Sequence, residues 1–309
     1  MSRLVVLSIL VLTCLPVSSY AQVLYGSLTG NVTDSTASPV PGAKVDVINT
    51  SNGVARQTAT DDRGAYSFND LQPGSYKITI TSGSFAAFIR EGIPVDAATS
   101  RRLDARLQIA RINESVTVEA AAMTLQTDRG EVSAQIQKEE IEDLPMDGGR
   151  NFQNLLKLLP GFTPPEELHS DAGNPQRAMG TNANGVSYSN NNTRIDGATV
   201  SYPWLPHIVA YVPPAESIQT VNVVTNAFDA EQGMAGGAAM NVTIKSGTNQ
   251  FHGSAWEFHN NSALKARNYF YCLYSCPGDP NQPAKNLMNQ PGFTFGGPVK
   301  KNKLFFFAS

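Results

Sequence analysis

The chain has 309 residues, a formal net charge of −3 and a charged fraction of only 16%. This length is sufficient for two or three domains. Acidic residues slightly outnumber basic ones and no basic block is present, which argues against binding of nucleic acid. Gly, Asn, Thr and Ser are plentiful, so β-structure with many turns is favoured over a helical protein.

Residues 1–21 have the three parts of a secretory signal peptide. Arg3 supplies the positive start, residues 4–15 form an apolar core, and Pro16 ends that core. Residues 19–21, Ser-Tyr-Ala, fit a small-x-small cleavage site. A retained anchor is the less favoured interpretation, because the apolar core is too short for a stable membrane span. We therefore expect an exported protein that is cleaved after residue 21.

Residues 24–109 contain strand-like runs at short, regular spacing, with turn signals between them, as in a small β-sandwich. About seven strands are expected. The turns are Ser-Pro-Val-Pro-Gly, Asp-Asp-Arg-Gly and Leu-Gln-Pro-Gly, in which Asp and Gly favour chain reversal and Pro fixes the backbone. Three runs place alternate residues on one face: Val45, Val47 and Asn49; Tyr66 and Phe68; and Tyr76, Ile78 and Ile80.

The segments GNVTD, PVPGAKV, TDDRGAYSF and LQPGSYKITI together resemble the carboxypeptidase regulatory-like domain, a prealbumin-type sandwich. In carboxypeptidases this domain lies beside a zinc peptidase. None of the four histidines of this chain has an acidic residue three positions later, so the His-x-x-Glu pattern of that family is absent. The resemblance therefore implies an accessory module. We expect no catalytic residue, and we expect that the protein is not an enzyme.

Residues 110–140 form a polar connector with one β-like segment at 114–120, which comprises Glu114, Ser115, Val116, Thr117, Val118, Glu119 and Ala120. Val116 and Val118 are β-branched and lie on one face. This suits an extended peptide that adds as a strand to the sheet edge of a partner. An ordinary strand that continues the sandwich fits the same pattern.

Residues 141–250 begin with a turn at 144–150 and a short amphipathic helix at 151–159. Phe152, Leu155, Leu156 and Leu159 share one face of this helix, with Lys157 opposite, which predicts core packing. A hairpin is expected at 193–198, where Asp196 reads as a turn former more readily than as a ligand. Two β-runs at 218–224 and 240–245 flank a Gly/Ala-rich patch at 233–239, where we expect a close approach of backbones, as against a barrel wall.

An aromatic cluster lies in the same region. It comprises Tyr202, Trp204, His207 and Tyr211, together with two prolines. Such a cluster can face an incoming substrate, and it can equally pack against a neighbouring wall. We take these four residues as candidate substrate-facing residues.

Residues 252–259 alternate with period two, so that Ser254, Trp256 and Phe258 share one face. Aromatics on one side only predict a strand with one apolar and one polar face, as in outer-membrane barrels. Alternation recurs at 291–296, and the polar turn 300–303 leads into a further strand at 304–308.

Cys272 and Cys276 lie in a loop-like stretch between these strands. In an oxidising compartment an even pair favours a disulfide over free thiols. A single C-x-x-x-C without nearby His or further Cys cannot supply the four ligands of zinc. No metal and no cofactor are expected.

The stretch GGAAMNVTIKSGTNQFHGSAWEF resembles the junction of plug and barrel in TonB-dependent outer-membrane receptors of the Oar-like kind. The resemblance implies a mainly β fold: a prealbumin-like sandwich, an α+β plug domain at 141–250, and the first strands of an incomplete transmembrane β-barrel at 251–309. It identifies residues 114–120 with a TonB box, the peptide through which such receptors are energised. Two or three strands cannot close a barrel, so we expect a fragment of a longer receptor.

The implied function is binding of a solute at the cell surface and its import across the outer membrane. The implied partners are a TonB-type periplasmic energy-transducing protein, outer-membrane lipid and an unknown solute, with no nucleic acid. The sandwich and the connector would lie in the periplasm. The alternative is an exported or surface-attached module for glycan binding or adhesion, in which the sandwich is the binding part.

Overall fold

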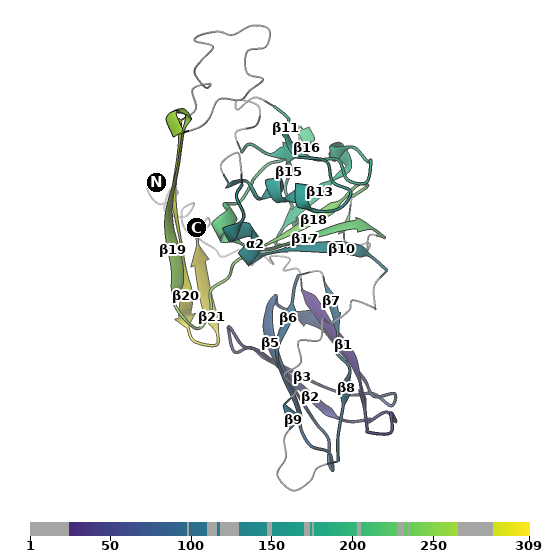
Figure 1. The fold of residues 1–309 in the computed structure, drawn as a ribbon. Coiled ribbons are helices and arrows are strands. Elements are labelled where there is room, and N and C mark those ends of the chain that lie inside the picture. Colours follow the sequence, from purple (N-terminus) through teal and green to yellow (C-terminus); the bar gives the residue numbers. More distant parts are fainter. Residues whose placement is uncertain are drawn as a thin grey trace, which may run out of the picture.

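The computed structural model describes residues 25–97, 99–109, 116–117, 130–146, 150–169, 174, 176–202, 205–227, 232–233, 235–264 and 287–309. These residues form three units in chain order, a sandwich, a central domain and a three-stranded sheet (Figure 1). The predicted signal peptide, Trp204, Cys272 and Cys276 lie outside the described residues.

The first unit is a sandwich of two sheets. Its strands are β1 (Gly26–Thr33), β2 (Lys44–Asn49), β3 (Ala55–Ala59), β4 (Ala65–Leu71), β5 (Gly74–Thr81), β6 (Phe88–Val95), β7 (Ser100–Arg102) and β8 (Ala105–Arg106). One sheet has the order β4-β1-β7, with β8 also paired to β1, and the other has the order β3-β2-β5-β6-β9. In the second sheet the short β9 (Val116–Thr117) pairs in parallel with β6.

The sandwich core is closed by alternating apolar side chains, as the sequence predicts. Val47, Ile78 and Ile80 are fully buried, and burial of each such side chain contributes about 1.5–3 kcal/mol. Tyr66 is also buried, and its hydroxyl donates a hydrogen bond of 2.6 Å to the carbonyl of Leu103. Burial raises the pKa of Tyr66, because the phenolate would lose its water.

The second unit, the central domain (residues 130–245), is built on a five-stranded sheet of order β10-β17-β18-β13-β14. These strands are β10 (Val132–Gln137), β17 (Ile218–Asn226), β18 (Ala239–Ile244), β13 (Asn192–Ile195) and β14 (Ala198–Thr199). β13 runs parallel to β18, and the other pairs are antiparallel. Within the described residues, β10 forms one edge of this sheet.

One face of the central sheet is apolar and packs against two short helices, α2 (Lys138–Asp143) and the 3₁₀ helix η1 (Phe152–Leu158) (Figure 1). Further short elements cover the domain: β11 (Glu166–Glu167), β12 (Met179–Gly180), η2 (Tyr188–Asn190), β15 (Ser201–Tyr202), β16 (Leu205–Val209) and η3 (Ala215–Ser217). The expected hairpin is present, since Asp196 and Gly197 both take positive φ between β13 and β14.

Two elements of the central domain differ from the sequence-based expectation. The predicted helix at 151–159 is a 3₁₀ helix that is buried on its polar side as well, because Gln153 makes hydrogen bonds of 2.9 and 3.2 Å with the backbone of Met179. Residues 132–143, of which the sequence analysis assigned 132–140 to a connector, form β10 and α2. The run VSAQIQ buries only Ile136, so its sequence lacks the alternation of apolar residues that marks a strand.

The third unit is a meander of three antiparallel strands, β19 (His252–Asn261), β20 (Leu287–Lys300) and β21 (Leu304–Ala308), with the one-turn 3₁₀ helix η5 (Ser262–Leu264) after β19. Its outward face is exposed and includes Phe293 and Phe295. The alternation predicted for β19 is confirmed, but its aromatic side turns toward the central domain. Trp256 is paired across the strands with Gly292 of β20, and its indole ring packs over that glycine, where an added Cβ would come within 2.4 Å of the ring.

Candidate functional site: the polar junction of the central domain

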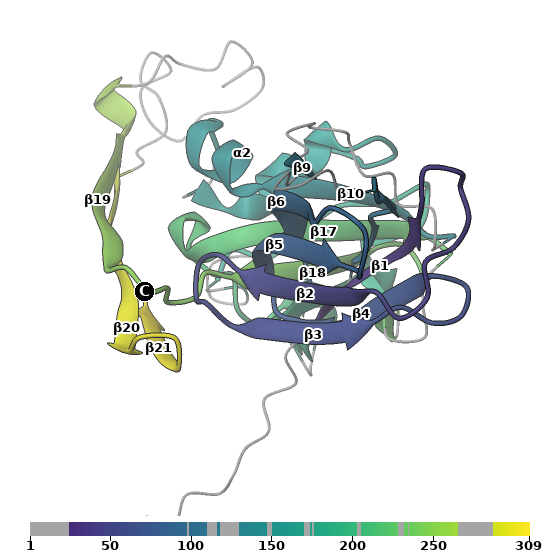
Figure 2. The ribbon, with the colours of Figure 1, turned by 90° about the horizontal axis from the view of Figure 1, so that it is seen from below.

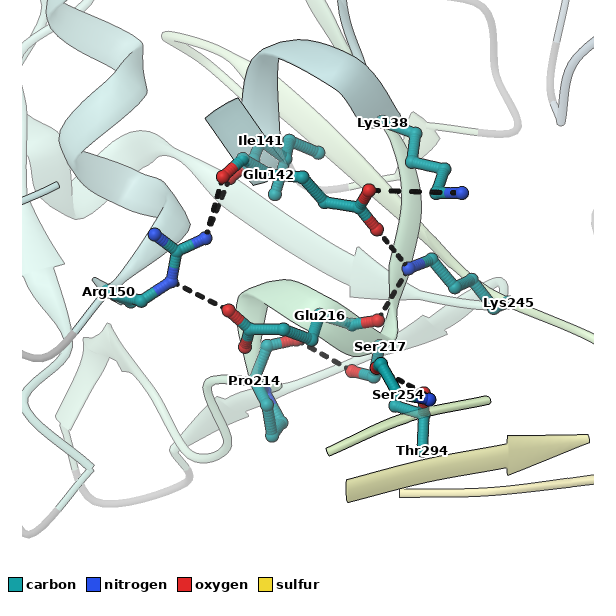
Figure 3. Close-up of polar contacts among 10 residues, drawn as sticks. All are labelled: Lys138, Ile141, Glu142, Arg150, Pro214, Glu216, Ser217, Lys245, Ser254 and Thr294. Carbon is teal, nitrogen blue, oxygen red and sulfur yellow. Dashed lines mark hydrogen bonds and ion pairs between the residues drawn. The ribbon is translucent and has the colours of Figure 1, made fainter. Parts of the chain in front are cut away.

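A buried arginine joins three segments of the central domain. The guanidinium of Arg150 donates to a Glu216 carboxylate oxygen over 2.6 Å, and it also donates to the carbonyls of Ile141 and Glu142 over 3.3 and 3.1 Å (Figure 3). Those two carbonyls belong to α2, and cations are favourable near the C-terminal end of a helix. Both ion-pair partners are largely buried, with side-chain exposures of 17% and 12%. Arg150 therefore fixes α2 to η3.

A lysine at the end of β18 makes a second connection to the same two elements. The ammonium of Lys245 donates to a Glu142 carboxylate oxygen and to the Glu216 carbonyl, each over 2.6 Å. Its backbone N–H donates to the Ser217 carbonyl over 2.8 Å. Lys138 lies 3.9 Å from the Glu142 carboxylate, one helical turn away (Figure 3). We call Glu142, Arg150, Glu216 and Lys245 the polar junction.

The polar junction depends on pairing for its stability. Loss of one partner from a buried pair leaves an uncompensated charge, which costs about 3–5 kcal/mol. Arg150 also has a positive φ of 57°, a backbone conformation that is unfavourable for a residue with a side chain. Strain of this kind, held in place by several contacts, is concentrated at functional positions.

The junction also touches the third unit. The Arg150 guanidinium lies over the Phe258 ring of β19, 4.5 Å from its centroid, within the range of a cation–π interaction. Nearby, the Arg177 guanidinium comes within 3.9 Å of the Met288 sulfur of β20. A cavity of about 240 Å³ lies between these parts and is lined by both arginines, Gln176, Asn289, Gln290 and the Val212–Pro214 stretch among others.

A row of polar side chains crosses four strands of the central sheet. In register, Gln135 of β10 pairs with Asn222 of β17, Asn222 with Asn241 of β18, and Asn241 with Arg194 of β13. Asn222 and Asn241 are 3% and 1% exposed. Side-chain amide atoms of Gln135, Asn222 and Asn241 are buried without a hydrogen-bond partner from the described residues. One face of this sheet is thus buried but polar.

The predicted candidate residues are only partly visible. Tyr202, at the end of β15, and Tyr211 are exposed, as contact with a solute requires. The backbone of His207 lies in β16, its side chain is not described, and Trp204 lies outside the described residues. Of residues 114–120, the structure describes only the backbone of Val116 and Thr117, as β9 on the sandwich edge.

The Gly/Ala-rich patch at 233–239 approaches a loop of its own domain. The N–H groups of Gly236 and Gly237 donate to the Asn190 carbonyl over 2.8 and 3.2 Å. A Cβ on Gly237 would come within 2.5 Å of the Asn191 amide oxygen. The expected close approach of backbones is present, but its partner is the segment 190–191.

The polar junction and the polar row escaped the sequence analysis. A signal for the junction was present, because Arg150 and Glu216 are single charges directly before buried runs and Lys245 directly follows one. The signal for the row was the asparagine within two otherwise β-branched or apolar strands, TVNVV and AMNVT.

Comparison with known families assigns each unit. Residues 27–108 match the carboxypeptidase regulatory-like domain, residues 124–240 the TonB-dependent receptor plug domain, and residues 243–309 an outer membrane beta barrel domain. The chain belongs to the TonB-dependent receptors. The central domain of this receptor is therefore its plug, and β19, β20 and β21 are barrel strands. The plug match begins before β10, in agreement with the place of β10 in the plug sheet.

A curated relative of the receptor is the TonB-dependent transporter Oar of Myxococcus xanthus, 28% identical over 305 residues. The alignment covers 93% of this chain and 27% of Oar, so the chain spans about a quarter of that relative. Solved structures with local similarity include the siderophore receptor PirA from Acinetobacter baumannii, with 22% identity and a TM-score of 0.38. The match covers 55% of this chain and 22% of PirA. The ferric enterobactin receptor PfeA from Pseudomonas aeruginosa gives 17% identity, a TM-score of 0.39 and the same coverage.

Two features are absent from the part of the chain that the structure describes. No helix among them is long and apolar enough to cross a membrane. No group of three or more His, Cys, Asp or Glu side chains among them is placed to hold a metal ion.

Proposed function

We propose that this chain is part of an outer-membrane receptor that binds a solute at the cell surface and imports it with energy from a TonB-type periplasmic protein. The signal peptide at 1–21 would direct its export. The observation that supports this proposal best is the place of β10. This strand directly follows the connector that holds residues 114–120, and it lies at the edge of the plug sheet.

An edge strand is the part of a sheet that a pull removes most easily. Among the strands that the structure describes, β10 is bonded to β17 alone, so its departure leaves the β17–β18–β13 pairing intact. A partner that adds a strand to residues 114–120 gains main-chain hydrogen bonds, and it can then draw the connector and β10 away. The chemistry required is binding and displacement, and no bond of the solute is broken.

Removal of β10 would uncover a surface that tolerates water. Gln135 leaves with β10, and Asn222 of the polar row is then exposed beside Asn241. The Asn222 amide nitrogen and the Asn241 amide oxygen have no hydrogen-bond partner among the described residues, although the Asn241 nitrogen donates to Gln232 over 2.9 Å. Hydration would satisfy the hydrogen-bonding capacity that these two atoms leave unused in the closed plug. The plug therefore opens along a polar face, and of the apolar cluster packed with α2 and η1 only Ile136 leaves with β10.

The polar junction would set the limit of this opening. α2 is the next element after β10, and the Glu142–Lys245 ion pair holds it to the end of β18. Arg150 holds it to η3, because its guanidinium donates to two α2 carbonyls and pairs with Glu216. Arg150 in addition contacts Phe258 of the barrel wall. We propose that β10 yields before α2 does, so that the plug opens on one side and remains seated against the wall.

For the solute, we propose contact with the aromatic cluster. Tyr202 and Tyr211 are exposed, and Trp204 and His207 complete the set in sequence. Aromatic rings with a polar tip bind ligands that present both apolar and hydrogen-bonding groups.

The experiment that tests the proposal is Val116→Pro in the receptor as its natural gene encodes it. Proline removes a main-chain donor, so capture of the receptor by the periplasmic domain of the TonB-type protein should fall at least about tenfold. Ala122→Pro is the matched control, because it places the same residue in the same connector outside 114–120. Receptor abundance in the outer-membrane fraction is measured in parallel by blotting.

Unchanged capture by the Val116→Pro receptor, at equal abundance, would contradict the assignment of residues 114–120. A soluble periplasmic product that binds glycans would favour the alternative, a glycan-binding module that uses the sandwich.

A further inference from the structure

The sandwich contacts the point where the plug continues into the barrel. The Ser51 carbonyl, in the turn between β2 and β3, accepts a hydrogen bond of 3.0 Å from the N–H of Asn249. Asn249 lies in the linker 245–251 between β18 and β19. In both ribbon views, the sandwich lies beside the plug and near the end of the β20–β21 hairpin (Figures 1 and 2).

Asn249 is at the same time bonded to the β20–β21 turn of the barrel strands. Its amide nitrogen donates to the Asn302 side-chain oxygen over 2.7 Å, and its own side-chain oxygen accepts from the Asn302 N–H over 2.8 Å. Asn302 occupies the turn between β20 and β21 with a positive φ of 61°, a conformation that asparagine tolerates well. Linker and turn are thus joined by a reciprocal pair of hydrogen bonds.

The turn of the sandwich is shaped for this contact. The Asn49 side-chain oxygen accepts from the N–H groups of Ser51 and Asn52, and the Asn52 side chain accepts from Val54. Asn49 is 1% exposed, so the turn is anchored in the sandwich core. A turn held by its own side chains presents its backbone with little further loss of entropy on contact.

Glycine is required at the centre of this turn for two reasons. Gly53 has a φ of +74°, and a Cβ at this position would lie 2.4 Å from the Asn302 side-chain oxygen. Gly42, in another turn of the sandwich, has a φ of +67° with nothing within 4 Å of its Cβ position. The two glycines share the backbone conformation, and Gly53 alone of this pair has the contact.

We propose that the N-terminal sandwich is a brace, docked through its β2–β3 turn onto the plug–barrel linker and the β20–β21 turn of the barrel wall. This goes beyond uptake itself, and the docking stands whether or not a solute is imported. Its mechanical consequence rests on the proposed function. The connector has the sandwich at one end and β10 at the other, so a fixed sandwich directs a pull on residues 114–120 toward β10.

The docking is tested by a disulfide in the complete receptor, in a background with Cys272→Ser and Cys276→Ser. The test pair is Gly53→Cys with Asn302→Cys. The Asn302 Cγ lies 3.2 Å from the Cβ position of Gly53, and a disulfide places Sγ about 3 Å from the opposite Cβ. The control pair is Gly42→Cys with Asn302→Cys, which carries the same backbone strain without the contact.

Cells are treated with a mild oxidant, and the bond is read as a mobility shift that reduction reverses. We expect cross-linking of most of the test receptor and, in the control, no more than the background of the single-cysteine variants. Equal yields in the two pairs would overturn the proposal.

A second measurement needs no cysteine. Gly53→Ala should speed amide hydrogen exchange of the Asn249 N–H, which is bonded to the Ser51 carbonyl, by about fivefold, the change expected from loss of one net hydrogen bond. Gly42→Ala should leave this exchange unchanged. Capture of the receptor by the periplasmic domain of the TonB-type protein separates the two proposals. A receptor that has lost docking should still be captured through residues 114–120. A receptor that docks but is not captured contradicts only the proposed function.

Discussion

The sandwich and the plug both bury a β-sheet core, and they fill it differently. In the sandwich the inner faces are almost wholly aliphatic or aromatic, and the polar Asn49 is satisfied by its own turn. The plug buries one apolar face, and on the other it places Asn222 and Asn241, each with one amide atom that has no hydrogen-bond partner among the described residues. An apolar core holds one arrangement, whereas a polar one can exchange its partners for water. The difference suits a fixed brace beside a part that must open.

The largest effect should come from the charged side of the plug. Arg150→Ala leaves the Glu216 carboxylate buried and unpaired, so we expect the plug to lose about 3–5 kcal/mol of stability. Native-state hydrogen exchange, which follows plug and sandwich amides separately, should show this loss in the plug alone. The double variant Arg150→Ala with Glu216→Ala should recover part of it. A double variant that loses more stability than the two single variants lose together would argue against the pairing.

Exchanging a core residue of the sandwich for the type found in the plug, and the reverse, should change the stability of the two domains differently. Val47→Asn places an unsatisfied amide in the sandwich and removes apolar contacts, which should cost about 3 kcal/mol. Asn222→Val removes an unsatisfied amide from the plug, so plug stability should stay within about 1 kcal/mol of the parent or rise. The same exchange measurement reads both. Equal destabilisation by the two variants would contradict the difference between an apolar sandwich core and a partly polar plug core.

The smallest effect concerns the plug hairpin. Asp196 is exposed at the surface, yet partial desolvation of its carboxyl raises its pKa, and a hydrogen bond from the Ile244 N–H partly offsets this. A raised folded-state pKa means that stability falls as pH rises from the unfolded value of 3.8 through the folded one. Asp196→Asn accepts the same bond and suits positive φ, so it should gain below about 0.5 kcal/mol near neutral pH. The gain should vanish under acidic conditions, and a gain that grows as pH falls would contradict this origin.

Much of the fold followed from local patterns in the sequence. Alternation at residues 45–49 and 76–80 and the turn residues between them predict the sandwich, because its core is built from side chains two positions apart. β10 was missed, because an edge strand with one buried residue has no such pattern. The direction of the β19 faces was missed too, since alternation distinguishes two faces without saying which one meets the plug.

The candidate site was less accessible from sequence than the fold. Arg150, Glu216 and Lys245 are far apart in the chain, and only the tertiary structure brings them together. Ion pairing between distant residues leaves no periodic signature. The exposed residues Tyr202 and Tyr211 could be named from composition, and their contact with a solute remains a prediction.

The outward face of the barrel strands has a measurable height. Between Asn289 and the end of β20 the exposed apolar side chains run from Pro291 to Val299, which corresponds to about 26 Å of strand, or about 20 Å of vertical rise at a tilt of about 40°. This is close to the lipid-facing band of about 25 Å in outer-membrane barrels. Beyond it the face turns polar, where His259 and Asn289 bond side chain to side chain over 2.6 Å. The far ends of β19 and β20, where this polar pair lies near the exposed Leu287, therefore suit the boundary between lipid and water.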